Sequence, residues 1–168
     1  HGPAVTVPSS IDFLAEHPGT GIILVGREDA LRAELARHSR PEDGRLSIHP
    51  AEQVVDMDED VRSAIRTKKH SSMRIAIDLV KSGRAQACVS AGNTGALMAM
   101  AKLSLRTMPG IDRPALAALL PTLGDNDVVM LDLGANTDCD ARNLVQFAIM
   151  GAAYSRIVTG LEAPRVRL

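Results

Sequence analysis

The sequence predicts an α/β protein whose sheet is mostly parallel and is covered by helices on both faces. Short apolar runs, typical of strands that are buried on both faces, alternate along the chain with segments of helical periodicity. Strands that alternate with helices form βαβ units, and these units build parallel sheets. The chain has 168 residues, 45% hydrophobic and 23% charged, which fits the size and composition of a globular domain. We therefore expect a single α/β domain over residues 1–168.

The individual elements follow from apolar spacing and from capping residues. The expected order is a helix at 9–16, a strand at 21–26, a helix at 29–38, a weaker strand at 45–49, a helix at 73–80, a strand at 85–89, a helix at 96–105, an apolar run at 115–120, a strand at 128–133 and a helix at 141–158. Ser9 or Ser10 is expected to cap the first helix, and Ser71 or Ser72 the third. A glycine follows the third helix and the last one, as is common where helices end.

Composition argues against several classes of function. Aromatic residues make up 2% of the chain and Trp is absent, which disfavours nucleic-acid recognition by base stacking. The formal net charge of −1 gives no global attraction to nucleic acid or to an anionic membrane. Two cysteines, Cys88 and Cys139, are too few for a disulfide framework and fit a reducing cytoplasm, with both expected to be core thiols. The sequence holds no apolar stretch of about 20 residues, so no membrane span is expected.

The most informative motif is the turn at 90–95, Ser-Ala-Gly-Asn-Thr-Gly, between an expected strand and an expected helix. Backbone N–H groups converge at such a turn and the positive end of the helix dipole lies there, so the turn favours a phosphate or a carboxylate. Ser90, Asn93 and Thr94 add side-chain donors. The alternative is a tight turn in which glycine supplies a positive φ and Thr94 is the N-cap. Because Asn93 lies on a turn, replacing it by Ala is expected to affect turnover and not folding.

A second motif runs from Leu131 to Asp138 and places carboxylates at the end of a strand. Asp132 lies near that strand's end, and Asn136 and Asp138 lie in the following turn. Such carboxylates can bind a metal, orient a nucleophile or transfer a proton. Helix capping by Asp138 or Asp140 is the alternative, but it leaves Asp132 unexplained, because a carboxylate on an apolar strand needs a partner. No metal is expected, since no histidine or further carboxylate stands at ligand spacing, and the site is expected between the two turns.

Residues 62–74 carry five cations in thirteen positions. These cations are Arg62, Arg66, Lys68, Lys69 and Arg74. Such a patch suits an acidic or phosphate-bearing partner. The alternative is a solvated helix face that pairs with the acidic run at 56–60. The five histidines give no readable Ser-His-Asp arrangement, and His1 is either a tag remnant or the end of a motif that begins earlier.

Together these segments resemble the phosphate acyltransferase family of bacterial phospholipid synthesis. The matching stretches, in family order, are 1–3, 68–69 with 71–74, 87–98, 109–114, 131–136 and 146–151. The match at 87–98, Ala-Cys-Val-Ser-Ala-Gly-Asn-Thr-Gly-Ala-Leu-Met, is the most specific. Family members carry a strand before His-Gly-Pro and roughly as much sequence again after position 168. The resemblance therefore implies that the chain is the N-terminal half of a longer protein.

The resemblance implies a Rossmann-like α/β/α fold of three layers, similar to isocitrate and isopropylmalate dehydrogenases and incomplete in this chain. It also implies transfer of a fatty acyl group from acyl carrier protein to inorganic phosphate, giving acyl phosphate. The family's members are homodimers of the cytoplasm that associate peripherally with the membrane. We expect no cofactor, no metal and no nucleic-acid partner. The alternative function is a non-catalytic α/β domain that binds a phospho-ligand, whereas a nicotinamide dehydrogenase is disfavoured because Gly-x-Gly-x-x-Gly is absent.

For the implied reaction, the candidate residues fall into three groups. The expected phosphate-binding residues are Ser90, Gly92 and Gly95. The expected catalytic residues are Asn93, Thr94, Asp132, Asn136 and His1. The cations expected to dock the acidic carrier protein are Arg66, Lys68, Lys69 and Arg74. A covalent acyl-enzyme is not required if phosphate attacks directly, so Cys88 need not be a nucleophile.

Overall fold

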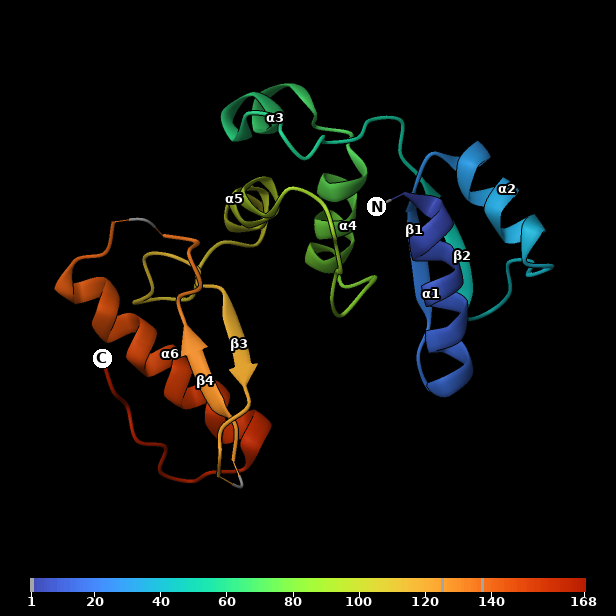
Figure 1. The fold of residues 1–168 in the computed structure, drawn as a ribbon. Helices are drawn as coiled ribbons and strands as arrows, with labels where there is room; N and C mark the ends of the chain where they lie inside the picture. The colour runs from blue at the N-terminus through green and yellow to red at the C-terminus, as the bar shows by residue number, and fades with distance from the viewer. Residues whose placement is uncertain (1, 125, 137) are drawn as a thin grey trace. The chain divides into compact units, whose positions relative to one another are not determined.

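The computed structural model describes residues 2–124, 126–136 and 138–168. Within these residues the protein is α/β, with six helices and two two-stranded sheets, which confirms the expected class. The chain divides into two compact units, His1–Leu105 (unit 1) and Arg106–Leu168 (unit 2) (Figure 1). Along the described parts of the chain, no helix is long and apolar enough to cross a membrane.

Unit 1 opens with a small parallel sheet between two strands that a helix connects. The elements are α1 (Pro3–Glu16), β1 (Ile22–Gly26), α2 (Glu28–Arg37) and β2 (Leu46–Pro50). The strands pair in parallel, with Ile22 opposite Leu46 and Gly26 opposite Pro50, so the expected βαβ arrangement is confirmed here. A core of buried aliphatic side chains joins the four elements, namely Val7, Leu14, Leu24, Leu31, Leu35 and Leu46.

The first helix begins earlier than the sequence suggested. α1 starts at Pro3, which suits the first helical position because proline lacks the N–H that would be unpaired there. Ser9 and Ser10 therefore lie inside the helix, and neither is its N-cap. Their hydroxyls donate to carbonyl oxygens one turn back, Ser9 Oγ to Val5 O at 2.8 Å and Ser10 Oγ to Thr6 O at 2.7 Å.

Arg45, which directly precedes β2, holds the end of α1. Its Nη1 donates to the carbonyl oxygens of Leu14, His17 and Pro18 at 3.1, 3.3 and 3.2 Å. These carbonyls lie at or beyond the last turn of α1, where intrahelical partners run out. A cation at this end is also favourable for the helix dipole.

Three helices complete unit 1, α3 (Val61–Thr67), α4 (Ser72–Lys81) and α5 (Thr94–Leu105). Their buried side chains, with Val55 from the segment before α3, form a second core of Val55, Ala64, Met73, Ile77, Ala96 and Met100. Ser71 is the N-cap of α4, as one of the two expected serines. α3 was not expected; it has only seven residues, and Asp60 caps it by accepting from Ser63 N at 2.8 Å.

The expected strand at 85–89 is absent from the structure, although all five residues are described. The N–H groups of Arg84 and Ala85 turn back to Leu79 O, and Val89 is 97% exposed. A β-strand needs a neighbouring strand to accept its hydrogen bonds, and the described residues place none beside this segment. An apolar composition therefore misled the prediction, because it is a necessary condition for a buried strand and not a sufficient one.

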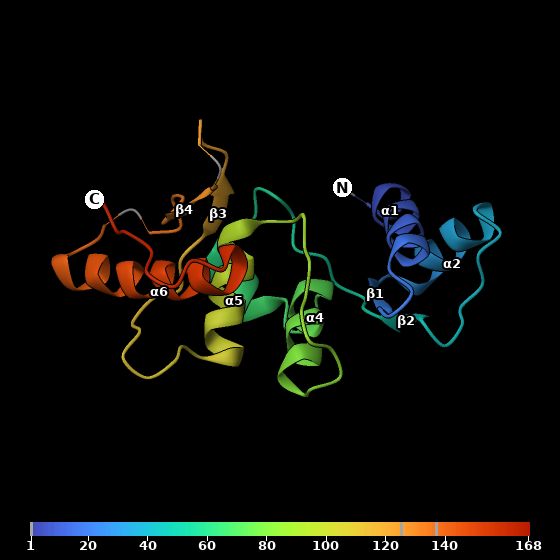
Figure 2. The same ribbon diagram turned by 90° about the horizontal axis from the view of Figure 1, so that it is seen from below.

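Unit 2 consists of a hairpin-like strand pair and one long helix. Its elements are β3 (Ala117–Leu120), β4 (Val128–Leu131) and α6 (Ala141–Thr159). β3 and β4 pair antiparallel, with Ala117 opposite Leu131, so the expectation of a mostly parallel sheet is wrong for this unit. Figure 2 shows α6 extended along one side of the unit, where it packs on β4.

The bounds of α6 agree with the sequence. Asp140 and Asn143 form a capping box at its start, and Gly160 follows its last residue with a φ of 73°. The left-handed conformation at Gly160 favours glycine, because other residues pay a steric cost there.

Candidate functional site

The turn at 90–95 lies directly before α5, as the sequence predicts. Ser90 Oγ accepts a hydrogen bond from Gly92 N at 3.2 Å, so this hydroxyl closes the turn. Thr94 is exposed and is the first residue of α5. Its hydroxyl and the N–H groups of Thr94 and Gly95 donate to no described residue. These donors lie at the positive end of α5 and remain available to an anion.

Asn93 caps α5 and is committed to the protein's own backbone. Its Oδ1 accepts from Ala96 N at 3.0 Å, which corrects the alternative that Thr94 is the N-cap. Its Nδ2 donates to three carbonyl oxygens of one loop, those of Asp56, Met57 and Glu59, at 3.4, 3.0 and 3.1 Å. The residue is 9% exposed. The amide thus holds the loop in this structure, and its catalytic role stays a prediction.

Gly92 and Gly95 are required by close packing. Neither has a positive φ, so that part of the tight-turn alternative is wrong. A Cβ on Gly92 would lie 3.2 Å from Met73 Cε, and one on Gly95 would lie 3.1 Å from Val61 Cγ2. Both distances are shorter than ordinary carbon contacts of about 3.5–4.0 Å. The small residues therefore let the turn pack against α3 and α4.

The basic run at 62–74 is divided by its contacts. Lys68 Nζ lies 2.7 Å from Glu59 Oε2 and 3.6 Å from Asp56 Oδ2, and it donates to Val54 O. The hydrogen bond with Glu59 raises the pKa of Lys68 and lowers the pKa of Glu59. The alternative that the acidic run pairs with the basic run is therefore confirmed for Lys68.

The other cations of the run behave differently from Lys68. Arg74 Nε pairs with Asp78 Oδ2 at 3.0 Å, one turn along α4. Arg62, Arg66 and Lys69 are exposed, and no carboxylate of the described chain lies within 4.0 Å of them. Of the four cations expected to dock a carrier, two are thus engaged within the protein, and two, Arg66 and Lys69, are not.

In unit 2, Asp132 has the partners that its position on an apolar strand demanded. Its Oδ1 accepts from Leu116 N at 2.8 Å, and its Oδ2 accepts from Asn136 N at 2.7 Å and Asn136 Nδ2 at 3.1 Å. Burial raises the pKa of Asp132, but the N–H donors of Leu116 and Asn136 outweigh it, so the pKa lies below its usual value. The carboxylate is thus held ionised and joins the segment before β3 to the turn after β4.

Asn136 is likewise engaged. Its Nδ2 donates to Pro114 O at 3.0 Å in addition to Asp132. The two N–H bonds of this amide are therefore both used within unit 2. A role as oxyanion donor, which the sequence suggested, needs one of these bonds to be given up.

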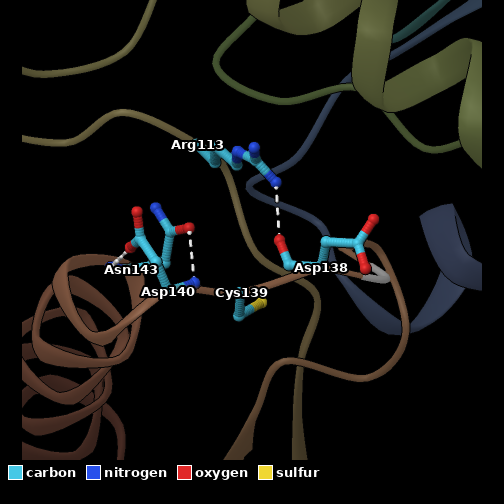
Figure 3. A pocket seen from close by; sticks show the side chains of 5 residues that line it. All are labelled: Arg113, Asp138, Cys139, Asp140 and Asn143. Carbon is cyan, nitrogen blue, oxygen red and sulfur yellow. Dashed lines mark hydrogen bonds between the residues drawn. The ribbon is translucent and has the colours of Figure 1, made fainter.

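An open pocket lies where α6 begins, and two of its lining residues, Arg113 and Asn143, were not among the residues expected at a site. Its lining residues are Arg113, Asp138, Cys139, Asp140 and Asn143 (Figure 3). Arg113 Nη1 donates to Asp138 O at 2.9 Å, and Asp140 Oδ1 accepts from Asn143 N at 2.8 Å, so helix capping by Asp140 is confirmed. The lining carries one cation and two carboxylates, a balance that does not favour a free anion.

Asp112, the residue before Arg113, is fixed on α6 by three contacts. Asp112 N donates to Gln146 Oε1 and Gln146 Nε2 donates to Asp112 Oδ2, both at 2.9 Å. Arg142 Nε pairs with the same carboxylate at 2.9 Å. Gln146 is only 5% exposed, so this clasp fixes the segment before β3 on α6. The stretch 109–114 was matched as a motif, but its long-range partner on α6 was not visible in the sequence.

The other residues singled out in the sequence are His1, the two cysteines and the candidate metal ligands. His1 lies outside the described residues. Cys88 is half-buried and burial raises the pKa of its thiol, whereas Cys139 is exposed, so the expectation of a core thiol is wrong for Cys139. Within the described ranges, no group of three or more metal-ligating side chains comes together. The turn at 90–95 belongs to unit 1 and Asp132 with Asn136 to unit 2, so their expected convergence stays a prediction.

Comparison with known proteins covers the entire chain. Residues 1–168 match the family described as Fatty acid synthesis protein. The chain is 52% identical over 168 residues to a protein of Herminiimonas arsenicoxydans named Phosphate acyltransferase, covering 100% of this chain and 47% of that protein. A protein of the same name from Erythrobacter litoralis is 56% identical over 167 residues, 99% of this chain and 47% of its own length. One from Halorhodospira halophila is 52% identical, and 49% of it is covered. The chain thus spans about half the length of the curated relatives it matches.

Proposed function

The chain belongs to the Fatty acid synthesis protein family, and from this premise we propose that it is part of an enzyme that transfers a fatty acyl group from acyl carrier protein to inorganic phosphate. The observation that carries the proposal is the match over the whole chain to relatives named Phosphate acyltransferase, at 52–56% identity. The name of these relatives states the acyl transfer and its acceptor. The carrier protein as donor comes from the family resemblance of the sequence motifs.

The proposed reaction needs two kinds of group. An oxygen of phosphate attacks the thioester carbonyl carbon, a C–O bond forms, and the C–S bond breaks. The carrier's sulfur leaves with the electron pair of that bond and takes up a proton. The site must therefore hold a phosphate dianion and also stabilise the negative charge that develops on the carbonyl oxygen.

We propose that the start of α5 supplies these donors. Thr94 is exposed at the first position of α5, and its hydroxyl and the N–H groups of Thr94 and Gly95 have no described acceptor. Ser90 and Gly92 shape the turn through the hydrogen bond between them. Asn93 connects the start of α5 to the loop at 56–59 by hydrogen bonds to both. Thr94 is thus the predicted catalytic residue that the geometry supports best.

For Asp132 we propose an orienting role. Three N–H groups donate to its carboxylate, and the lowered pKa makes it a weak base at neutral pH. It suits the task of holding Asn136 in a fixed geometry. His1 is retained only as a candidate from the motif at the start of the chain.

The partners and the architecture of the whole protein are also proposals. We propose a cytoplasmic homodimer that associates peripherally with the membrane, and a Rossmann-like three-layer fold of the dehydrogenase-like kind, to which this chain contributes one α/β domain. The parallel β1–β2 pair with its connecting helix supports this fold. Neither a cofactor nor a metal is required for the proposed reaction.

The test uses a full-length protein, meaning one of the relatives' length that contains this chain. Acyl carrier protein that carries a fatty acyl thioester is supplied with phosphate, and free carrier thiol and acyl phosphate are measured. We expect both products in equal amounts, and both should depend on phosphate. If phosphate binds in a calorimetric titration while the thioester stays intact, the second candidate, a non-catalytic phospho-ligand domain, replaces this proposal.

A further inference from the structure

Two adjacent lysines of the same run have opposite surroundings. Lys68 is the C-cap residue of α3 and its side chain is 25% exposed, enclosed by Glu59, Asp56 and Val54 O. Lys69 is exposed and has no described acidic partner. The sequence gives them identical chemistry, and the fold separates them.

Lys68 and Asn93 act on the same loop from two sides. Lys68 binds it through Val54 O and the carboxylate of Glu59, while Asn93 binds it through the carbonyl oxygens of Asp56, Met57 and Glu59. Glu59 Oε2 in addition accepts from Asp56 N at 3.1 Å. The loop is therefore fixed between the end of α3 and the start of α5.

The three cations of the run that have no described carboxylate partner lie in one region of unit 1. Arg62 and Arg66 are one helical turn apart, so they lie on one face of α3, and Lys69 follows the end of that helix. The opposite side of α3 is occupied by Ala64, which is fully buried in the second core. The helix is thus anchored by its apolar side and presents its cations outward.

We propose that Arg62, Arg66 and Lys69 form a docking surface for an acidic protein, the acyl carrier of the proposed function, and that Lys68 is a positioning residue for the loop at 54–60. The inference rests on the proposed function for the identity of the carrier. It reassigns Lys68 and Arg74, whose charges are already paired, and it adds Arg62, which was not among the expected docking residues.

An acidic protein fits this surface better than a membrane does. Electrostatic anchoring to anionic lipid uses clusters of roughly four to eight cations beside an apolar or amphipathic segment. Here two of the three cations lie on a short helix whose apolar side faces the core, and the third, Lys69, follows its end. A carrier that must bind, react and leave needs fast and weak association, which a few unpaired cations provide by steering.

The experiment measures matched variants of the full-length protein with two substrates. One is the acylated carrier protein, and the other is acyl-pantetheine, a thioester that lacks the carrier. For Arg62→Glu/Arg66→Glu/Lys69→Glu we expect the KM for acyl-carrier protein to rise about tenfold or more at low salt and the difference to shrink in high salt. Turnover of acyl-pantetheine should be unchanged. Lys102→Glu, on the exposed side of α5, controls for a change of charge elsewhere and should leave both activities within twofold.

Separate substitutions of Lys69 and Lys68 test whether the first docks the carrier and the second positions the loop. Lys69→Met should raise the carrier KM and leave the melting temperature unchanged. Lys68→Met should lower the melting temperature and reduce kcat with both thioesters, and this loss should not depend on salt. Equal behaviour of the two variants in all these measurements would overturn the assignment.

Two further outcomes count against the inference. A triple variant with unchanged carrier KM and unchanged salt dependence would leave α3 without a docking role. A triple variant that keeps its carrier KM but no longer sediments with phosphatidylglycerol vesicles would assign the surface to lipid. Failure of the proposed function is distinct, because the wild-type protein would then release no free thiol from either the acylated carrier protein or acyl-pantetheine.

Discussion

Replacing Asn93 by Ala should destabilise the protein, because this side chain connects the start of α5 to the loop at 56–59. The cap bond from Ala96 N to Asn93 Oδ1 is worth about 1 kcal/mol by the usual cost of removing an N-cap residue. The three bonds from Nδ2 go to carbonyl oxygens of a partly exposed loop. Since water can replace some of them, we assign their loss about 1 kcal/mol.

The total of about 2 kcal/mol corresponds to a fall in melting temperature of roughly 4–8 °C for a chain of this size. Urea unfolding followed by far-UV circular dichroism measures the free energy, and a thermal scan measures the melting temperature. Asn93→Ser separates the two parts, because serine keeps an oxygen at the N-cap and lacks the amide donor. We expect Asn93→Ser to lose about half as much stability as Asn93→Ala.

A result within about 0.5 kcal/mol of the wild type for Asn93→Ala would refute this reasoning, since that is the range of surface substitutions without special contacts. The activity of the two variants then has a clear meaning. A loss of turnover in Asn93→Ser that is out of proportion to its loss of stability assigns the amide to the reaction. A loss that follows stability in both variants assigns it to the fold, in contrast to the expectation from the sequence that folding would be unaffected.

Three other predictions follow from contacts already described. The pKa of Asp132 is lowered in the folded protein, so its carboxylate contributes stability above its unfolded pKa of about 3.9, and this contribution is lost as the pH falls through the folded value. Asp132→Asn should therefore make the melting temperature fall less steeply between pH 6 and about pH 3. A melting temperature that falls as steeply as in the wild type would contradict this role of Asp132. Gly95→Ala should lower the free energy of unfolding by about 1–2 kcal/mol, because its Cβ would lie 3.1 Å from Val61 Cγ2. In a double-mutant cycle measured by urea unfolding, adding Val61→Ala should restore most of this free energy. If it restores none, the close contact with Val61 is not the cause of the loss. Cys139 should react with a thiol-specific dye before Cys88, whose thiol pKa is raised by burial, so Cys139→Ser should abolish the fast phase, and a fast phase that survives would show Cys88 to be accessible.

Local patterns in the sequence were sufficient for elements whose ends carry their own signals. The strand at Ile22–Gly26 has a continuous apolar run, and α6 is framed by an acidic N-cap and a glycine. α3 escaped prediction because seven mostly polar residues give too short a period, although its capping Asp60 was visible. The pairing direction of β3 and β4 was not readable either, because an apolar run specifies burial and not orientation.

The places of the two candidate motifs relative to the helices and strands were partly predictable from the sequence, whereas the partners of their polar side chains were not. The turn before α5 and the carboxylate after β4 were found from residue types and position. What Asn93, Asn136 and Lys68 bind was not, because their partners lie far from them in the chain or are backbone carbonyls that look alike in any sequence. Some polar side chains that the sequence suggested for ligand binding therefore form hydrogen bonds to loops of the protein itself.

The contacts of Arg45 carry a consequence for local motion. Its guanidinium donates to no other acceptor among the described residues, and three carbonyl oxygens at or just beyond the last turn of α1 depend on it. When the start of β2 opens, the end of α1 loses these bonds at the same moment, so the two segments should exchange their amide hydrogens as one cooperative unit even though about 30 residues separate them. The stability of the end of the N-terminal helix therefore depends on a side chain that precedes a strand and belongs to neither helix of the βαβ unit.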